Sequence, residues 1–212
     1  APTVARYHAA LGRSRLGLGD LQGAAESLEQ AVRLDGSDTE GLLLLAQAYK
    51  RMERAPDATS ALRRAIAVKP EDASLHFELA THLRSQNQIP QAMSAYREAA
   101  SKRAGFVEAH LGAAACASDL EQHKEAVREL TSAIEADSGR ADAHRTLAIT
   151  LRKMGDHAAA TSALENATRL DGKDGESFFW LADSRFKLGQ IDDALSDVRQ
   201  AIKRRPDDAA AH

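Results

Sequence analysis

Residues 39–72 read TEGLLLLAQAYKRMERAPDATSALRRAIAVKPED, and this stretch decides the fold. Its first half carries apolar or small residues at the three- and four-residue spacing of one helical face: Leu42, Leu45, Ala46 and Tyr49. Its second half repeats that spacing: Ala58, Leu62, Ala65 and Ile66. The stretch therefore predicts two amphipathic helices joined by a short turn.

The same pattern returns every 34 residues along the chain. Two series of alanines mark the interval without an exception: Ala24, Ala58, Ala92, Ala126, Ala160 and Ala194, and then Ala31, Ala65, Ala99, Ala133, Ala167 and Ala201. Six repeats follow one another with no insertion: 5–38, 39–72, 73–106, 107–140, 141–174 and 175–208. Residues 209–212 match the first four positions of a seventh repeat. We number the positions of each repeat 1 to 34 and predict a single array over residues 1–212.

Glycine and proline separate the two helices of each repeat. Position 15 is glycine in three repeats, as suits the left-handed residue that closes a helix: Gly19, Gly155 and Gly189. Pro56 and Pro90 fall at position 18, where proline is tolerated in the first turn of a second helix. Pro70 and Pro206 fall at position 32 and end that helix before the next repeat.

Composition excludes several classes of protein. Alanine makes up about a fifth of the chain and aromatic residues only 4%, which favours closely packed helices over a bulky β-sandwich core. A single cysteine excludes a disulfide framework and a cysteine-based zinc site. The net charge of −3 predicts no general attraction to nucleic acid or to an anionic membrane. No apolar run approaches the ~20 residues of a membrane-spanning helix, so we expect no direct membrane insertion.

The repeat resembles the tetratricopeptide repeat (TPR), and the likeness covers nearly the whole chain. The family pattern has glycine or alanine at position 8, alanine at positions 20 and 27, and an aromatic or aliphatic residue at position 24. Here position 8 holds Gly12, Ala46, Ala80, Ala114, Ala148 and Ala182. Position 24 holds Leu28, Leu62, Tyr96, Leu130, Leu164 and Val198. The resemblance implies an all-α fold, a right-handed α-solenoid of stacked antiparallel helix pairs whose first helices line a concave groove.

In this family the groove is lined mainly by positions 2, 5, 9, 12 and 13. In this chain position 2 is mostly acidic, position 5 mostly apolar, and positions 12 and 13 rich in lysine and arginine. The residues that we expect to bind a partner are Leu43, Gln47, Lys50, Phe77, Thr81, Arg84, Leu111, Arg145, Ile149, Arg152, Phe179, Asp183 and Phe186. Such a groove suits an extended or helical segment with apolar side chains flanked by charge. The alternative is that position 5 only packs between first helices and that the charges form a solvated surface.

The sixth repeat concentrates the aromatic residues of the chain. Phe179, Asp183 and Phe186 are spaced i, i+4 and i+7, so they share one stripe on the expected concave side. Aromatic anchors of this kind dominate the binding energy of interfaces. The alternative is that these side chains cover the face on which a seventh repeat would stack.

The fourth repeat shows the opposite composition. Its first helix reads Gly112-Ala113-Ala114-Ala115-Cys116-Ala117 and has almost no bulk. We expect either that neighbouring helices close in there or that the array has a weak point between two halves. Cys116 is interpreted as a small buried residue rather than a reactive thiol.

Histidine occupies position 4 in four repeats: His8, His76, His110 and His144. The geometry argues against a shared metal ion, because stacked helices lie ~8–10 Å apart and metal–nitrogen bonds are about 2 Å long. We expect each histidine to pack and hydrogen-bond against its own second helix in place of the usual aromatic residue. If several are buried and neutral, stability should fall below about pH 6.5.

No motif for catalysis, phosphate binding or calcium binding appears in the sequence. We therefore expect no enzyme activity, no cofactor and no metal. The paired acids Asp192-Asp193 and Asp207-Asp208 fit helix capping and solubility better than acid–base chemistry. The residue patterns of two TPR subtypes, the carboxylate clamp and the asparagine ladder of O-linked N-acetylglucosamine transferases, are missing from position 6.

The functional hypothesis is a non-enzymatic scaffold that binds a protein or peptide segment in the groove, as part of a larger protein or complex. Two alternatives remain open. The array could be the regulatory or substrate-docking region of an enzyme whose catalytic domain lies outside this chain, or a TPR component of a bacterial export or envelope apparatus. Exposed apolar ends also predict end-to-end self-association.

Overall fold

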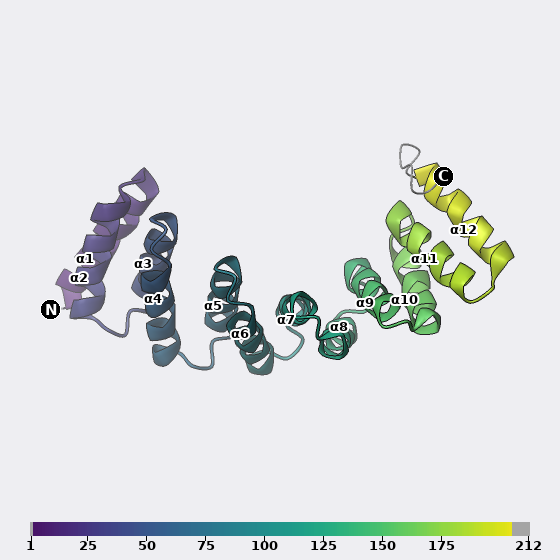
Figure 1. The fold of residues 1–212 in the computed structure, drawn as a ribbon. Helices are drawn as coiled ribbons and strands as arrows, with labels where there is room; N and C mark the ends of the chain where they lie inside the picture. The colour runs from purple at the N-terminus through teal and green to yellow at the C-terminus, as the bar shows by residue number, and fades with distance from the viewer. Residues whose placement is uncertain (1, 205–212) are drawn as a thin grey trace. The chain divides into compact units, whose positions relative to one another are not determined.

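The computed structural model describes residues 2–204, in which all regular secondary structure is α-helical. Twelve helices lie in these residues: α1 Pro2–Leu18, α2 Leu21–Leu34, α3 Thr39–Arg51, α4 Ala55–Val68, α5 Ala73–Ser85, α6 Ile89–Lys102, α7 Val107–Asp119, α8 His123–Ala136, α9 Ala141–Lys153, α10 His157–Leu170, α11 Gly175–Lys187 and α12 Ile191–Arg204. Each predicted repeat forms one pair of neighbouring helices (Figure 1). The predicted all-α fold of stacked helix pairs is confirmed.

The helices group into two compact units, one ending at Lys102 and the other beginning at Arg103. Within unit 1, α2 packs on α3 and α4 packs on α5. Within unit 2, α8 packs on α9 and α10 packs on α11. In both units the second helix of one repeat therefore packs against the first helix of the next, which is the contact that stacks the repeats.

Small residues allow this close packing. The alanines at positions 20 and 27 are all buried, and so are the small residues at position 8. Gly12 shows how little room remains, because a methyl group on it would come within 2.5 Å of Leu28 Cγ. Position 24 supplies the bulk opposite these small residues, and its leucines are fully buried: Leu28, Leu62, Leu130 and Leu164.

The helix ends follow the sequence signals and extend them. Asp20, Asp38, Asp156 and Asp174 cap the helices that follow them, each side chain accepting a hydrogen bond from a backbone N–H of the first turn. Pro56 and Pro90 lie in the first turns of α4 and α6, as predicted. Pro206, the Asp207-Asp208 pair and the start of the predicted seventh repeat at 209–212 lie outside the described residues.

Position 15 adopts the left-handed conformation in every repeat. The three glycines have φ between 77° and 83°, as the sequence predicted. Glu53, Asn87 and Glu121 take the same conformation at φ values of 59°, 56° and 58°. The turn geometry is therefore common to all six repeats, although only half of them have the residue that adopts it without strain.

Several individual expectations can be compared with the described residues. Cys116, Ala113 and Ala117 are fully buried, so the thin first helix of the fourth repeat is closely covered. The division between the two units falls just before this helix, between Lys102 and Arg103, rather than within it. No helix in residues 2–204 is both long enough and apolar enough to cross a membrane.

Two neighbouring glycines of α1 and its turn should respond oppositely to substitution. Gly17→Ala should raise the free energy of unfolding by roughly 0.5–1 kcal/mol, because Gly17 is helical and has open space around its Cα. Gly19→Ala should lower it by about 1 kcal/mol, because Gly19 has a φ of 83°. Chemical denaturation of both variants measures the difference, and equal effects of the two substitutions would contradict the assignment.

The buried alanine positions should not tolerate a larger residue. Ala126→Leu should destabilise the chain by ~1–3 kcal/mol, because Ala126 is completely buried in α8 and the extra atoms would separate packed helices. Ala158→Leu is the matched control, because Ala158 is exposed on α10, and it should change stability by less than about 0.5 kcal/mol. Thermal melts followed by circular dichroism distinguish the two outcomes.

Candidate partner-binding groove

Two adjoining hollows run along the first helices of unit 1. The first has a volume of about 610 Å³ and is lined by Ala9, Ala10, Arg13, Glu40 and Leu44, among others. The second has a volume of about 470 Å³ and is lined by Leu43, Leu44, Gln47, Lys50 and Glu78, among others. Because Glu40 and Leu44 line both hollows, the two lie side by side, and we call them together the unit 1 groove.

Charged pairs cross the unit 1 groove from one repeat to the next. Arg13 on α1 forms an ion pair with Glu40 on α3. Lys50 on α3 forms an ion pair with Glu78 on α5, with Nζ 3.1 Å from Oε2. Leu43 and Leu44 lie half-buried on α3 beside these pairs. The charges expected to face a partner are therefore paired with each other, and such exposed pairs contribute only about 0–1 kcal/mol.

The expected residues of the third repeat pack mainly on their own second helix. Phe77 is half-buried and meets the ring of Tyr96 edge-on, with the centroids 5.4 Å apart. The Thr81 hydroxyl lies 3.3 Å from the Tyr96 hydroxyl and donates to the Phe77 carbonyl at 3.0 Å. Thr81 and Lys50 also line a smaller hollow of about 210 Å³. Arg84 is exposed at the end of α5.

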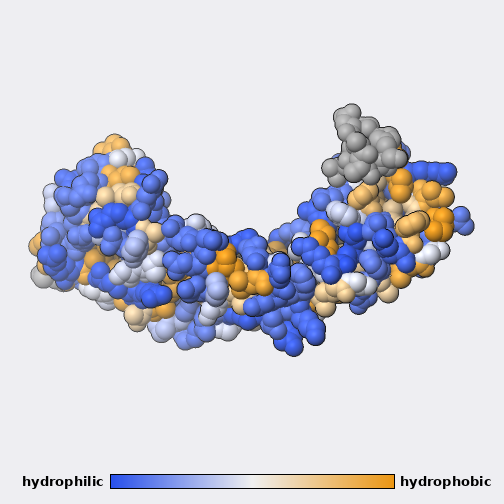
Figure 2. All heavy atoms as spheres, in the orientation of Figure 1, coloured by the Kyte–Doolittle hydropathy of each residue, from blue (hydrophilic) through white to orange (hydrophobic). Residues whose placement is uncertain are grey.

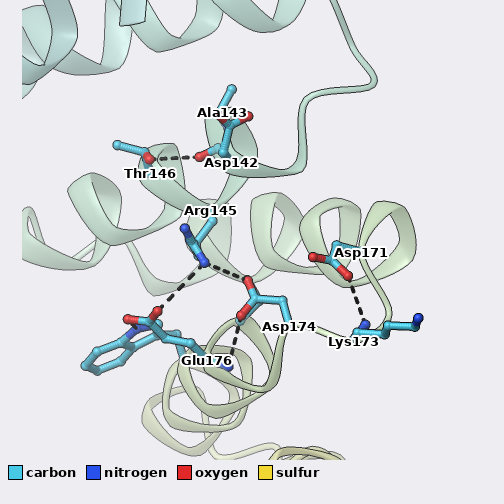
Figure 3. A network of polar contacts seen from close by, with 10 residues as sticks. Asp142, Ala143, Arg145, Thr146, Asp171, Lys173, Asp174 and Glu176 are labelled. Atoms are coloured by element: carbon cyan, nitrogen blue, oxygen red, sulfur yellow. Dashed lines mark hydrogen bonds and ion pairs between the residues drawn. The ribbon is translucent and has the colours of Figure 1, made fainter. Parts of the chain in front are cut away.

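In unit 2, Arg145 joins α9 to the start of α11 (Figure 3). Its Nη1 lies 2.9 Å from Asp174 Oδ2 and 3.7 Å from Glu176 Oε2. Asp174 also accepts hydrogen bonds from the Ser177 hydroxyl at 2.6 Å and from the Glu176 backbone N–H at 3.1 Å. Burial alone raises the pKa of Asp174, but the Ser177 hydrogen bond and the Arg145 charge outweigh it and hold the pKa below its ordinary value of 3.8.

Arg152 makes a second connection between α9 and α11. It forms an ion pair with Asp183, and its guanidinium lies 4.1 Å from the centroid of the Trp180 ring. Trp180 in turn meets Phe179 edge-on, with centroids 4.9 Å apart. Two arginines predicted to face a partner are therefore held by acidic and aromatic side chains of the next repeat. Leu111 and Ile149 lie half-buried on α7 and α9.

The aromatic stripe of the sixth repeat lines a hollow of its own. Phe179, Asp183 and Phe186 surround a volume of about 270 Å³ together with Ile191, Leu195 and Val198. The opposite wall belongs to α12, the second helix of the same repeat, rather than to the first helix of a neighbouring one. The structure thus brings the predicted stripe together, but on the outer face of the α11–α12 pair.

The residue-by-residue prediction omitted several side chains that line these hollows. Leu44, Glu40 and Glu78 line the unit 1 groove, and Ile191 and Leu195 line the hollow at α12. A sequence signal for the first group exists, because Arg13 and Lys50 stand 27 and 28 residues before their acidic partners. Opposite charges at this separation, close to one repeat length, indicate pairs between neighbouring first helices.

Two of the histidines at position 4 differ from their expected placement. His110 contacts its own second helix as predicted, with Nδ1 3.0 Å from Glu129 Oε2. His76 and His144 instead reach the turn that precedes their own helix, where Nε2 lies 2.9 Å from the Pro70 carbonyl and 3.2 Å from the Ser138 carbonyl. The reason is geometric, because position 4 lies in the first turn, within reach of the carbonyl at position 32 of the repeat before.

Burial limits the pH response that the sequence suggested for these histidines. His144 alone of the four is buried, whereas His8, His76 and His110 are half-buried. The condition that several be buried is therefore not met. Within residues 2–204 there is no cluster of three His, Cys, Asp or Glu side chains that could hold a metal ion.

Comparisons with known proteins agree on the kind of repeat. One model of the tetratricopeptide repeat matches residues 15–83 and 151–212, and a second model of this repeat matches residues 77–141. No curated protein sequence matches the chain.

Solved structures with a similar fold include YrrB, described as a TPR protein with an unusual peptide-binding site. It is 18% identical with a TM-score of 0.73, over 88% of this chain and 96% of that one. PilW, a type IV pilus biogenesis factor, is 19% identical with a TM-score of 0.63, over 100% of this chain and 98% of its own. Pseudomonas aeruginosa pilF is 16% identical with a TM-score of 0.64, over 99% and 95%. At these identities the likeness shows the fold alone.

The Arg145–Asp174 pair should give unit 2 a measurable response to acid. Because the pKa of Asp174 is lowered in the folded state, its contribution is present above its ordinary pKa and is lost as the pH falls through the lower, folded-state value. A double-mutant cycle with Asp174→Asn and Arg145→Gln should yield a coupling of about 1 kcal/mol near neutral pH. The coupling should decrease as the pH falls through the lowered, folded-state pKa of Asp174, and a coupling independent of pH would contradict this assignment.

Proposed function

Because the chain belongs to the tetratricopeptide repeat family, whose fold generally serves as a protein–protein interaction scaffold, we propose that it is a non-enzymatic scaffold binding a partner segment in the unit 1 groove. The observation that carries this proposal is the pair of adjoining hollows, of about 610 and 470 Å³, along the first helices. Together they are large enough to take several consecutive side chains of a linear segment.

The groove favours apolar side chains of the partner over isolated charges. Leu43 and Leu44 offer half-buried apolar surface on α3, with Ala9 and Ala10 on α1. The basic side chains of the rim are already paired with Glu40 and Glu78. A partner charge would therefore exchange with an existing weak pair, which sets orientation more than affinity. The segment that fits best has a short apolar stretch bordered by charged residues of both signs.

In unit 2 the corresponding surface of the first helices lies around Arg145, Arg152 and Trp180. The ion pairs there tie α9 to α11, and Arg152 is better shielded from solvent than the rim residues of unit 1. These side chains hold adjacent repeats in place and leave fewer groups for a partner. We therefore assign the primary partner surface to unit 1 and a stacking role to the unit 2 arginines.

The two other readings of the sequence lead to different expectations. The docking region of an enzyme and a component of an envelope apparatus both need the same kind of groove, and they differ in what adjoins it. PilW and Pseudomonas aeruginosa pilF match almost the full chain, but at identities that carry the fold only. The groove itself favours the general scaffold role, which is common to all three.

Selection of peptides against the 212-residue chain tests the proposal. Linear peptides drawn from a random displayed library should share apolar residues bordered by charges, and titration calorimetry should show one site per chain. Leu44→Glu should weaken the selected peptides by roughly tenfold or more, because it places a charge on the apolar floor.

Leu34→Glu is the matched control, because Leu34 is an exposed leucine at the end of α2 that lines neither hollow of the groove. It should leave affinity unchanged, and both variants should retain the helical circular dichroism of the parent. Peptides that bind Leu44→Glu as tightly as the parent chain, or a selection that enriches no sequence, would show that the groove is not the partner site.

A further inference from the structure

The outer face of the α11–α12 pair exposes several large apolar side chains. Phe186, Ile191 and Leu195 are 59%, 48% and 53% exposed around the hollow of about 270 Å³. Figure 2 shows apolar side chains gathered at this end of the unit. Leu195 is at position 21 of its repeat, and the residue at position 21 of the preceding repeat is Thr161 on α10. Thr161 is only 9% exposed, because α11 packs against α10. The α11–α12 face is thus the surface that receives a first helix elsewhere in the unit.

The chain shows what such a face receives. Leu181, at position 7 of α11, packs against Ala148, Ala160 and Leu164 at positions 8, 20 and 24 of the preceding repeat. The same positions of the sixth repeat are Ala182, Ala194 and Val198, and all three line the hollow. The hollow is therefore the empty counterpart of the site that Leu181 fills in the preceding repeat.

The outer face of α1 is the matching half of this interface. Positions 3 and 10 are the ones that first helices bury against the preceding repeat, as Ser177 and Ser184 of α11 are completely buried. On α1 these positions are Tyr7, which is 65% exposed, and Ser14, which is exposed. Leu11, at position 7, lies between them on the same helical face.

Charges at the two ends complement each other at the corresponding positions. Within unit 1, Arg13 at position 9 pairs with Glu40 at position 2 of the next repeat. At the ends the signs are reversed, because position 9 of the last repeat is Asp183 and position 2 of the first is Arg6. Among the six repeats, Asp183 is the one acid at position 9 and Arg6 the one base at position 2. Asp183 already accepts a hydrogen bond from Arg152 of the same chain, and this contact uses only its Oδ2 atom.

Further charges strengthen this match and one pair opposes it. α1 contains three arginines and no acidic residue, whereas α12 begins with the exposed Asp192 and Asp193. The opposing pair is Arg199 at position 25 with Arg15 at position 11. These two positions meet between stacked repeats, as the ion pair of Glu165 with Arg185 shows. Arg15 donates hydrogen bonds to the Gly23 carbonyl and the Ser27 hydroxyl. These hydrogen bonds hold its guanidinium against α2, so the repulsion from Arg199 falls at the edge of the proposed contact.

We propose that the α11–α12 face binds the outer face of α1 of a second copy of this chain, head to tail. Leu11 of one copy fills the hollow of the other, Tyr7 covers Leu195 and Phe186, and Arg6 reaches Asp183. The contact is heterologous, so a dimer keeps one free face of each kind and assembly continues beyond it. The proposed contact shares Arg6 and Ser14 with the lining of the unit 1 groove, but it uses neither Leu43 nor Leu44.

Sedimentation velocity of the 212-residue chain over a wide range of concentrations tests the contact. We expect the average mass to rise past that of a dimer. Leu195→Glu and Tyr7→Glu should each weaken association roughly tenfold or more, because each buries a charge in an apolar contact. Leu34 is an exposed leucine that lies on neither the α1 face nor the α11–α12 face. The Leu34→Glu variant should therefore associate as the parent does.

Mixing the two variants gives the decisive result. Tyr7→Glu keeps an intact α11–α12 face and Leu195→Glu keeps an intact α1 face, so an equimolar mixture should form a 1:1 dimer that grows no further. A mixture that stays monomeric, or a Tyr7→Glu variant that still dimerises through two α11–α12 faces, overturns the head-to-tail contact.

Two further outcomes also count against the proposal. One is a parent chain that remains monomeric at every concentration, and the other is an equal loss of association in Leu34→Glu. Ile191→Glu serves as the second variant of the α11–α12 face if circular dichroism shows that Leu195→Glu is misfolded.

Discussion

The close approach of helices over alanine is the contact on which the rest of the structure depends. Alanine at positions 20 and 27 is buried in every repeat, and the large leucines of position 24 fill the space that these small residues leave. Because each helix pair has two apolar faces and little bulk, its stability depends on packing against a neighbouring pair. Stacking therefore determines both where the first helices lie and which of their positions remain open to solvent.

Charge plays a different part in this chain from the one that composition alone implied. Lysines and arginines at positions 5, 9 and 12 reach acidic residues of the next repeat, as Arg13 reaches Glu40 and Arg152 reaches Asp183. Exposed pairs of this kind add little stability, but several along one edge favour a single alignment of the repeats. The same pairs leave the apolar floor at Leu43 and Leu44 as the feature that distinguishes one partner from another.

The fold could be predicted from the 34-residue period because burial of small residues repeats with that period. The left-handed turns were predicted only at the three glycines, since Glu53 and Glu121 adopt the same φ although glutamate has no preference for that conformation. The placement of groove residues was harder, because it depends on contacts between repeats. Phe186 has the right spacing for the concave stripe, yet it faces α12 because its repeat has no neighbour in the described residues. The histidine contacts were missed for a similar reason, since the carbonyl that His76 meets belongs to the preceding repeat.

A repeat protein carries an unpaired copy of its own stacking interface at each end, and the residues there show whether those ends are suited to each other. In this chain the end positions depart from the interior pattern in matched ways. Position 3 changes from a buried residue to the exposed Tyr7, and position 21 changes to the exposed Leu195. Arg13 at position 9 pairs with Glu40 at position 2, and the signs of the charges at these two positions are the opposite in Asp183 and Arg6. A face adapted only to water would have polar residues at these positions, so the coincident changes favour two faces that bind each other.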